Sequence, residues 1–282
     1  MTEVRDIVYR PRGRISGLRA GAHASRGIGT FGTFRDQVPF MAHPDARRID
    51  VRGTLRDPFE NTLVRRFQQR SAIDVYALVD MTRSLSYEGR ARKQDLVAEL
   101  CGALARSVIR NGDRFALIGF DSDIRPDCFV PPNRRLASAV DVEARLRQAE
   151  WRGRDAGGLR DAARRVAGRR KIVFVISDFL LPLELLQQGC EALSQHDLIP
   201  VVIDDSSEGD DLPDWGLLEL TDLETLQRKV VFMRPALKRR WLAQEAERRA
   251  GIRTILLRFG RAPVVVADAL DVDLISRQLM EA

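Results

Sequence analysis

The sequence predicts an α/β protein with a doubly wound, mostly parallel sheet, preceded by an irregular arm rich in Arg and Gly. From residue 71 onward, short apolar runs alternate with longer segments whose apolar residues recur at helical spacing. The runs are apolar at nearly every position, as expected for parallel strands that are covered by helices on both faces. We therefore divide the chain into an arm, residues 1–70, that packs on a core domain, residues 71–282.

The arm segment GAHASRGIGTFGTFRD has too many glycines for a helix, so we expect one or two short strands in the arm. In the core, strands are predicted at 72–80, 114–121, 124–132, 171–178, 198–205 and 252–260. Helices are predicted at 91–113, 134–149, 157–167, 183–194, 236–251 and 272–280, with Gly251 ending the fifth. A hairpin is predicted from residues 216–222 and 228–234, turning at 223–227.

Composition limits the classes of protein that remain. The three cysteines, Cys101, Cys128 and Cys190, lie far apart, which argues against a zinc or disulfide framework and fits a reducing compartment. The N-terminal segment lacks the apolar stretch of a signal peptide, and no run approaches the roughly 20 apolar residues of a membrane helix. We expect a cytoplasmic protein without membrane insertion.

The positive charge is unevenly distributed. Residues 1–70 contain 14 Arg and seven acidic residues, whereas the remainder has 32 basic and 33 acidic residues. Such asymmetry is one indication of nucleic-acid binding. However, Arg outnumbers Lys 42 to 4 throughout the chain, and the arginines of PDARRIDVRGTLRDP alternate with Asp, which favours internal ion pairs.

Four predicted strands end on aspartate, and one of them continues as Asp-x-Thr-x-Ser. Ligands of open α/β sheets bind beyond the carboxyl ends of the strands, so Asp80 and Asp178 are expected to face one crevice if their strands are neighbours. Alternate residues of a loop can point the same way, which brings the hydroxyls of Thr82 and Ser84 to the same place. These oxygens suit Mg²⁺ or Mn²⁺. Alternatively, the aspartates cap helices and the hydroxyls satisfy loop amides.

The chain resembles a von Willebrand factor A domain and, more narrowly, the MoxR-associated bacterial group called domain of unknown function fifty-eight. The resemblance covers about residues 20–205 and depends on the order of GAHASRGIGTFGTFRD, HPDARRIDVRGTLRDP, LVRRF, DMTRS and NGDRFALIGFD. The size and the Gly-Ala-His segment also resemble MxaS-like proteins encoded beside methanol dehydrogenase genes.

The resemblance implies a metal-ion-dependent adhesion site, in which a D-x-S-x-S loop, a Thr of a second loop and an Asp of a third loop hold a divalent cation. Asp80, Thr82 and Ser84 match the first loop, with Thr in place of the first Ser, and Asp178 matches the third.

The second loop departs from the family pattern. It is expected within Trp151–Ala163, which has neither Thr nor Ser, so that Gly158 or a neighbour stands at the missing ligand. Asp155 or a water molecule is the candidate substitute, and Arg83 adds a positive charge beside the site. The interpretation therefore stays open between a cation site and a degenerate site without metal.

The resemblance implies a non-catalytic adaptor that works with a MoxR-type AAA+ ATPase in the maturation of a client protein, or in inserting its cofactor or metal. For an MxaS-like member the client would be an alcohol dehydrogenase. The arm would help to form the partner surface, for which we select Arg47, Arg48, Asp50, Arg52 and Arg56.

A phosphoester hydrolase and a nucleic-acid-binding protein are the two alternative functions. A haloacid-dehalogenase-type phosphoester hydrolase also has Asp at the end of its first strand, but needs a second Asp where this chain has Thr82, and Lys171 starts its strand instead of following it. A nucleic-acid-binding protein would use the basic arm. No phosphate-binding loop or nucleophile elbow is present in the sequence.

Overall fold

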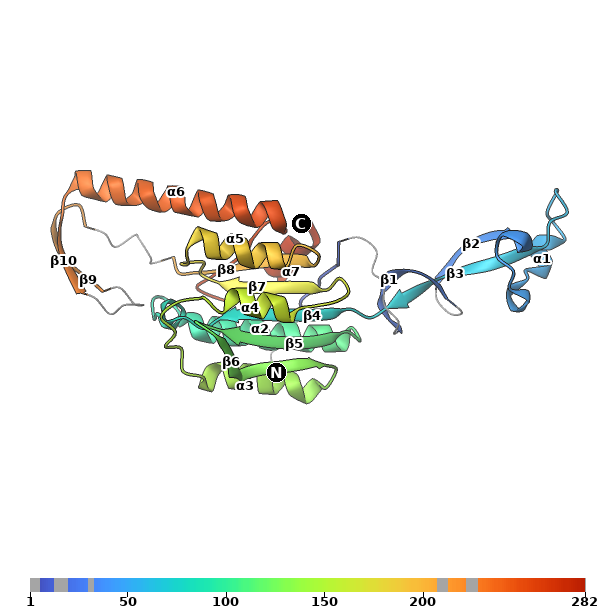
Figure 1. Cartoon of the computed structure of the whole chain (residues 1–282), viewed down its shortest axis with the longest axis horizontal. Helices are drawn as coiled ribbons and strands as arrows, with labels where there is room; N and C mark the ends of the chain where they lie inside the picture. The colour runs from blue at the N-terminus through green and yellow to red at the C-terminus, as the bar shows by residue number, and fades with distance from the viewer. Residues whose placement is uncertain (1–5, 13–19, 30–32, 207–212, 222–227, 282) are drawn as a thin grey trace. The chain divides into compact units, whose positions relative to one another are not determined.

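The computed structural model describes residues 6–12, 20–29, 33–206, 213–221 and 228–281 (Figure 1). Backbone contacts divide the chain into two compact units. The core unit comprises Met1–Arg10 and Asp74–Ala282, and the arm unit comprises Pro11–Ile73. Residues 6–10, which sequence analysis assigned to the arm, thus belong with the core unit.

The core unit contains a six-stranded sheet in the order β11-β8-β7-β4-β5-β6. Every neighbouring pair is parallel except β5 and β6, which are antiparallel at one edge. The strands are β4 (Asp74–Asp80), β5 (Arg114–Phe120), β6 (Ile124–Asn133), β7 (Ile172–Ser177), β8 (Asp197–Asp204) and β11 (Val264–Ala267). The predicted fold class, an α/β protein with a mostly parallel sheet, is confirmed, and β4 is central, between β5 and β7.

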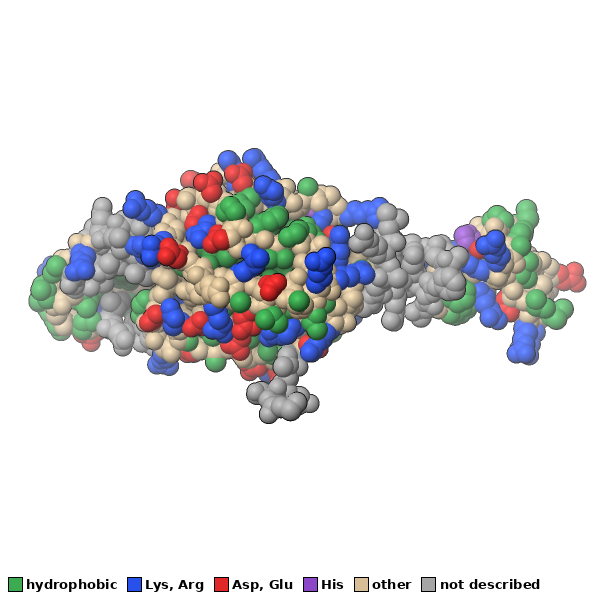
Figure 2. Space-filling view, turned by 90° about the horizontal axis from the view of Figure 1, so that it is seen from below, with side chains coloured by type: hydrophobic (Ala, Val, Ile, Leu, Met, Phe, Trp, Pro, Cys, Tyr) green, Lys and Arg blue, Asp and Glu red, His purple; other side chains and the backbone are tan. Residues whose placement is uncertain are grey.

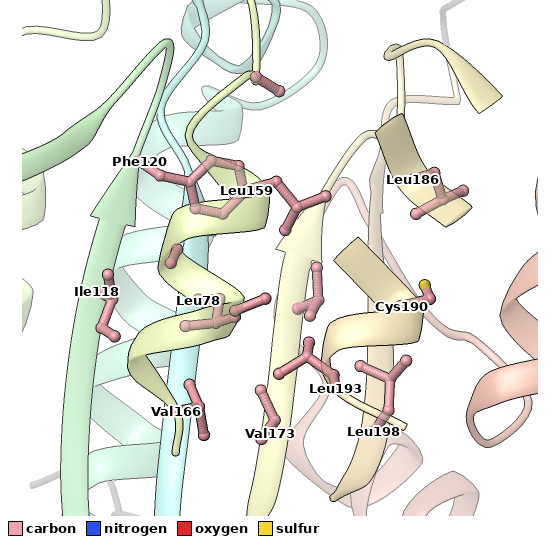
Figure 3. Close-up of a cluster of buried hydrophobic side chains, with 14 of the residues drawn as sticks. Leu78, Ile118, Phe120, Leu159, Val166, Val173, Leu186, Cys190, Leu193 and Leu198 are labelled. Carbon is pink, nitrogen blue, oxygen red and sulfur yellow. The ribbon is translucent and has the colours of Figure 1, made fainter. Parts of the chain in front are cut away.

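Helices cover both faces of this sheet. They are α2 (Lys93–Arg110), α3 (Leu136–Gln148), α4 (Leu159–Arg165), α5 (Leu183–Ala192), α6 (Pro235–Phe259) and α7 (Val272–Glu281). On one face, Leu78, Ile118 and Val173 of the strands pack against side chains from α4, α5 and α6 (Figure 3). Successive side chains of a strand point to opposite faces of the sheet, and helices cover both faces. Every residue of β4 after Asp74 is therefore buried, which explains its unbroken apolar run.

The described residues of the N-terminal segment lie against the other face. The Ile7 amide donates to Ser107 Oγ of α2 at 2.8 Å, and the Val8 amide donates to Ser276 Oγ of α7 at 3.0 Å. Arg261, fully buried, donates to both Asp197 carboxylate oxygens and to the Arg10 carbonyl. This buried pair therefore ties the N-terminal segment to the start of β8.

The predicted helix end at Gly251 and the predicted strand 252–260 are wrong. Helix α6 continues through Gly251 to Phe259, and the last strand is β11. Ile252 and Leu256 are buried one helical turn apart, so the apolar residues after Gly251 keep helical spacing instead of forming a strand. A Cβ on Gly251 would lie 3.2 Å from Leu183 Cδ1, so the glycine allows α5 and α6 to approach closely.

The predicted hairpin is confirmed as β9 (Gly216–Thr221) and β10 (Arg228–Met233), which pair antiparallel. Its turn lies outside the described residues. The other predicted core strands and helices are present, with ends shifted by at most three residues. No helix among the described residues is long and apolar enough to cross a membrane.

The arm unit is more regular than the sequence suggested. In place of one or two short strands it has a three-stranded antiparallel sheet in the order β1-β3-β2, formed by β1 (Ala20–Gly29), β2 (Thr33–Pro39) and β3 (Leu63–Ser71). Between β2 and β3 lie two 3₁₀ turns, Phe40–Ala42 and Ala46–Arg48, and the short helix α1 (Val51–Thr54). The alternation of apolar and polar residues that identifies strands was hard to see in the sequence, because β1 and the β2–β3 connection are rich in Gly and Arg.

Candidate metal centre

The candidate centre lies where β4 and β7 end side by side. Asp80 is the last residue of β4, and Asp178 directly follows β7, which pairs with β4 in parallel. After Asp80 the chain makes a bridge from Thr82 to Gly153 and then a 3₁₀ turn at Arg83–Ser86. The structure therefore brings together the two aspartates that sequence analysis paired.

The oxygen atoms of the first loop form a buried cluster. Asp80, Thr82 and Ser84 are each at most 4% exposed. Asp80 Oδ1 accepts a hydrogen bond from the Thr82 amide at 3.0 Å, and the Thr82 and Ser84 hydroxyls lie 3.1 Å apart. Such a set of carboxylate and hydroxyl oxygens is of the kind that Mg²⁺ and Mn²⁺ prefer.

Ser177 belongs to the same cluster, and sequence reasoning missed it. Its hydroxyl donates to Asp80 Oδ2 at 2.7 Å and accepts from the Phe179 amide at 2.8 Å. The available signal was a single polar residue at the end of the otherwise apolar run IVFVIS. Ser177 thus holds the Asp80 carboxylate and shapes the turn that leads into Asp178.

Asp178 has one carboxylate oxygen without a partner. Its Oδ1 accepts from the Leu180 amide at 3.1 Å, whereas Oδ2 is buried and makes no hydrogen bond among the described residues. The next residue, Phe179, is buried with φ of +56°, an unusual conformation for a bulky side chain. A buried carboxylate oxygen without a donor or a cation is unfavourable, so it identifies a place where a ligand would bind.

The electrostatics of Asp80 and Asp178 also favour a bound cation. Burial of the Asp80 carboxyl, together with repulsion from Asp178, raises the pKa of Asp80 from 3.8 to about 7. A divalent cation between the two carboxylates would remove this repulsion. The donor set therefore fits a hard cation held by Asp80, Thr82, Ser84 and Asp178, the ligands that the resemblance implies.

The second loop contributes backbone instead of a hydroxyl ligand. The Arg83 amide donates to the Gly153 carbonyl at 2.9 Å. A Cβ on Gly153 would lie 2.4 Å from Asp121 Cβ, and one on Gly158 would lie 2.7 Å from the Asp123 carbonyl. Neither position therefore has space for Thr or Ser.

Asp155, the candidate substitute ligand, lies outside the buried oxygen cluster. It is exposed, and its Oδ1 accepts from the Gly157 amide at 2.9 Å, as in a turn cap. Among the described residues it makes no hydrogen bond or ion pair with Asp80 or Asp178. No group of three or more His, Cys, Asp or Glu suited to a metal occurs in the described part of the chain, so the hydroxyls are essential to any cation site here.

The other strand-ending aspartates have different surroundings. Asp121 is paired with Arg125 at 3.1 Å, and Asp204 Oδ1 accepts from the Asp205 amide. Asp178 and Asp204 line a cavity of about 420 Å³ beside the centre, together with Glu245, Arg248, Ile252 and Leu256 of α6. The cavity is lined by both apolar and charged side chains and gives a ligand at Asp178 room to extend.

The residues selected for partner binding fall into two groups. Asp50 is buried and accepts from Arg65 Nε at 2.7 Å and from the Gly53 amide, and Arg48 pairs with Asp45 at 3.0 Å, so both support the arm unit. Arg47, Arg52 and Arg56 are exposed. Ion pairing thus accounts for part of this set, as the alternation of Arg with Asp suggested, and leaves three arginines at the surface.

The fold and the oxygen cluster define an α/β domain with a candidate cation site at the carboxyl edge of its sheet. The chain belongs to the family described as protein of unknown function DUF58, whose model matches residues 39–251.

A relative from Paracoccus denitrificans, "Uncharacterized protein in moxR 3'region", is 35% identical over 101 residues, which are 34% of this chain and 92% of that protein. Among solved structures, BatB from Bacteroides thetaiotaomicron has a TM-score of 0.43 at 14% identity and covers 74% of this chain and 98% of that chain. The SpRpn10 VWA domain has a TM-score of 0.42 at 7% identity, with coverages of 75% and 95%.

Proposed function

We propose that this protein is a non-catalytic adaptor that works with a MoxR-type AAA+ ATPase in the maturation of a client protein or the insertion of its cofactor or metal. Family membership and the relative from the moxR 3' region support the choice of partner. An alcohol dehydrogenase is the first client to test, because of the resemblance to MxaS-like proteins.

The unpartnered Asp178 Oδ2 beside the buried Asp80 is the observation that carries the proposal. Asp80, Thr82, Ser84 and Asp178 would hold Mg²⁺ or Mn²⁺, and the bound cation would supply a coordination position for an acidic side chain of the partner. Ser177 keeps the Asp80 carboxylate in place through its 2.7 Å hydrogen bond. Without a cation, the negative charge of Asp80 and Asp178 would repel the acidic side chain of the partner, so the partner would bind more weakly at this site.

The hydrolase alternative lacks support at the residues it needs. Position 82 is Thr, whose hydroxyl lies 3.1 Å from that of Ser84. Lys171 Nζ donates to the Ala167 carbonyl at 2.5 Å, before β7 begins, whereas Asp80 lies where its strand ends. Parallel strands put these two ends at opposite edges of the sheet.

Calorimetric titration of Mg²⁺ and Mn²⁺ into the purified protein tests the cation site. We expect saturable binding that Asp80→Ala abolishes and that Asp121→Ala, at the neighbouring strand end, leaves intact. Absence of binding to the wild type at millimolar metal would refute the site. Binding of the purified ATPase with Mg²⁺ and with EDTA then tests the adaptor role, and the proposal predicts weaker binding in EDTA and in Asp80→Ala.

A further inference from the structure

The loop region between β2 and β3 buries the carboxylate of Asp50 and exposes several large apolar side chains. Asp50 is only 5% exposed and accepts hydrogen bonds from Gly53, Gln37 and Arg65. The most exposed large hydrophobics of this region are Met41 at 90%, Val51 at 63%, Leu55 at 80% and Phe59 at 80%, and Ile49 is 38% exposed. Several apolar side chains at this exposure in one small region are characteristic of an interaction site.

Hydrogen bonds to the start of β3 hold this region in place. The Leu63 amide donates to Thr54 Oγ1 at 2.9 Å, and the Asp50 amide donates to the Leu63 carbonyl at 2.8 Å. Val51 and Leu55 are four residues apart on the α1 turn, so they share one side of it. The apolar side chains are therefore presented by an ordered backbone.

The same region carries unpaired positive charge. The arm unit has twelve Arg and five acidic residues, and three of those acids are used in pairs: Asp36 with Arg66, Asp45 with Arg48, and Asp50 with Arg65. The exposed arginines that make no side-chain hydrogen bond or ion pair with any described residue are Arg47, Arg52 and Arg56. Figure 2 shows hydrophobic and basic side chains over this part of the unit, with acidic side chains at its end.

We propose that these residues form a docking surface for an acidic protein partner with an apolar groove. The surface, called the arm tip, consists of Met41, Arg47, Val51, Arg52, Leu55, Arg56 and Phe59. Charge complementarity selects the partner: three exposed guanidinium groups without an ion pair among the described residues, in the same short region as exposed apolar side chains, match carboxylates beside an apolar groove. On the proposed function above, the ATPase is that partner.

The composition of the arm tip favours a protein over other anionic surfaces. Met, Phe and Arg are enriched and Lys is depleted in protein interfaces, and the arm tip has no Lys. Recognition of anionic lipid uses clusters of about four to eight basic residues, more than the three here. Single-stranded nucleic acid is bound by several aromatic rings, whereas three of the four apolar side chains are aliphatic.

Three variants of the full chain test the surface. Leu55→Ser with Phe59→Ser removes apolar contacts, and Arg47→Glu with Arg52→Glu and Arg56→Glu inverts the charge. The matched control, Arg134→Glu with Arg135→Glu and Arg240→Glu, inverts exposed arginines elsewhere without known ion pairs among the described residues. All should unfold at the wild-type temperature, because exposed side chains contribute little to stability.

Two probes separate this proposal from the adaptor role. The first is the MoxR-type ATPase; the second is a short fluorescein-labelled peptide in which Glu alternates with Leu and Phe, compared with its Gln analogue. We expect the wild type to prefer the Glu peptide, and both tip variants to bind it and the ATPase at least roughly tenfold more weakly, with the control unchanged.

Equal binding of the Glu peptide by wild type and both tip variants would overturn the proposal. So would tip-dependent binding of phosphatidylserine vesicles or single-stranded DNA in preference to the peptide. If the ATPase fails to bind the wild type while the peptide result holds, the adaptor role fails and the arm tip stands. If the ATPase binds wild type and tip variants equally, the arm tip fails as its docking surface.

Discussion

Replacing Asp80 by Asn should stabilise the metal-free protein at pH 8, although Asp80 lies at the candidate site. The carboxyl is 1% exposed, and burial and Asp178 raise its pKa from 3.8 to about 7. An acid whose pKa is higher in the folded than in the unfolded state binds its proton more tightly when folded. Stability therefore falls as pH rises from about 4 to about 7.

The magnitude follows from the size of this rise. Each pH unit between the two pKa values is worth about 1.4 kcal/mol, so ionised Asp80 costs the folded state about 4 kcal/mol above pH 7. Asn loses part of the hydrogen bonding to Ser177 and Thr82, at a cost of about 1–2 kcal/mol. We expect a net gain of about 2–3 kcal/mol at pH 8, or roughly 5–10 °C in the unfolding temperature.

Thermal unfolding in metal-free buffers between pH 4.5 and 8 measures this effect. The difference between Asp80→Asn and wild type should be largest at pH 8 and nearly absent at pH 4.5, where Asp80 is protonated. Asp121→Asn is the control, because Asp121 is already neutralised by Arg125 at 3.1 Å. A variant that is less stable than wild type at pH 8, or a difference that does not change with pH, would refute this account of the site. Added Mg²⁺ should stabilise the wild type and leave Asp80→Asn unchanged.

Three further predictions concern the surroundings of the site and the arm unit. Gly153→Thr supplies the hydroxyl that the second loop lacks, but its Cβ would meet Asp121, so we expect a loss of about 1–3 kcal/mol in denaturant unfolding and no gain in Mg²⁺ affinity. Leu78→Ala empties a fully buried position of β4 and should cost about 2–5 kcal/mol in the same assay; a smaller loss would mean that the core around Leu78 collapses to fill the space. In the arm unit, the hydrogen bond from Arg65 lowers the pKa of Asp50 to about 2, so its stabilising contribution is present above about pH 4 and is lost as pH falls toward 2. Pepsin cleavage within residues 11–73, normalised at each pH to cleavage of an unfolded control peptide, should therefore be faster at pH 2.5 than at pH 4.5, and Asp50→Asn should reduce this difference.

The fold was largely predictable because its main signals are local. Burial on both faces makes β4 and β7 apolar at consecutive positions, and that pattern is visible without the structure. The error at 252–260 arose because Gly251 was taken as a helix end. Its packing against Leu183 of α5 is a tertiary contact that no local pattern records.

The site was predictable to the extent that strand ends determine it. The parallel pairing of β4 and β7 follows from the doubly wound topology, and it places Asp80 and Asp178 together. The role of Ser177 and the steric block at Gly153 depend on side-chain and backbone distances between segments about 30 to 100 residues apart. A pattern of residue types cannot supply such distances.

The sequence by itself determined the α/β class, the Asp-x-Thr-x-Ser loop and the location of the excess Arg, because each depends only on residue types and their spacing along the chain. Only the tertiary structure decided which charges are free. Arg48 and Arg52 are equivalent in the sequence, yet the first pairs with Asp45 and the second faces solvent. The physical reason is that an ion pair needs opposite charges within a few ångströms, and this distance is set by how the chain folds.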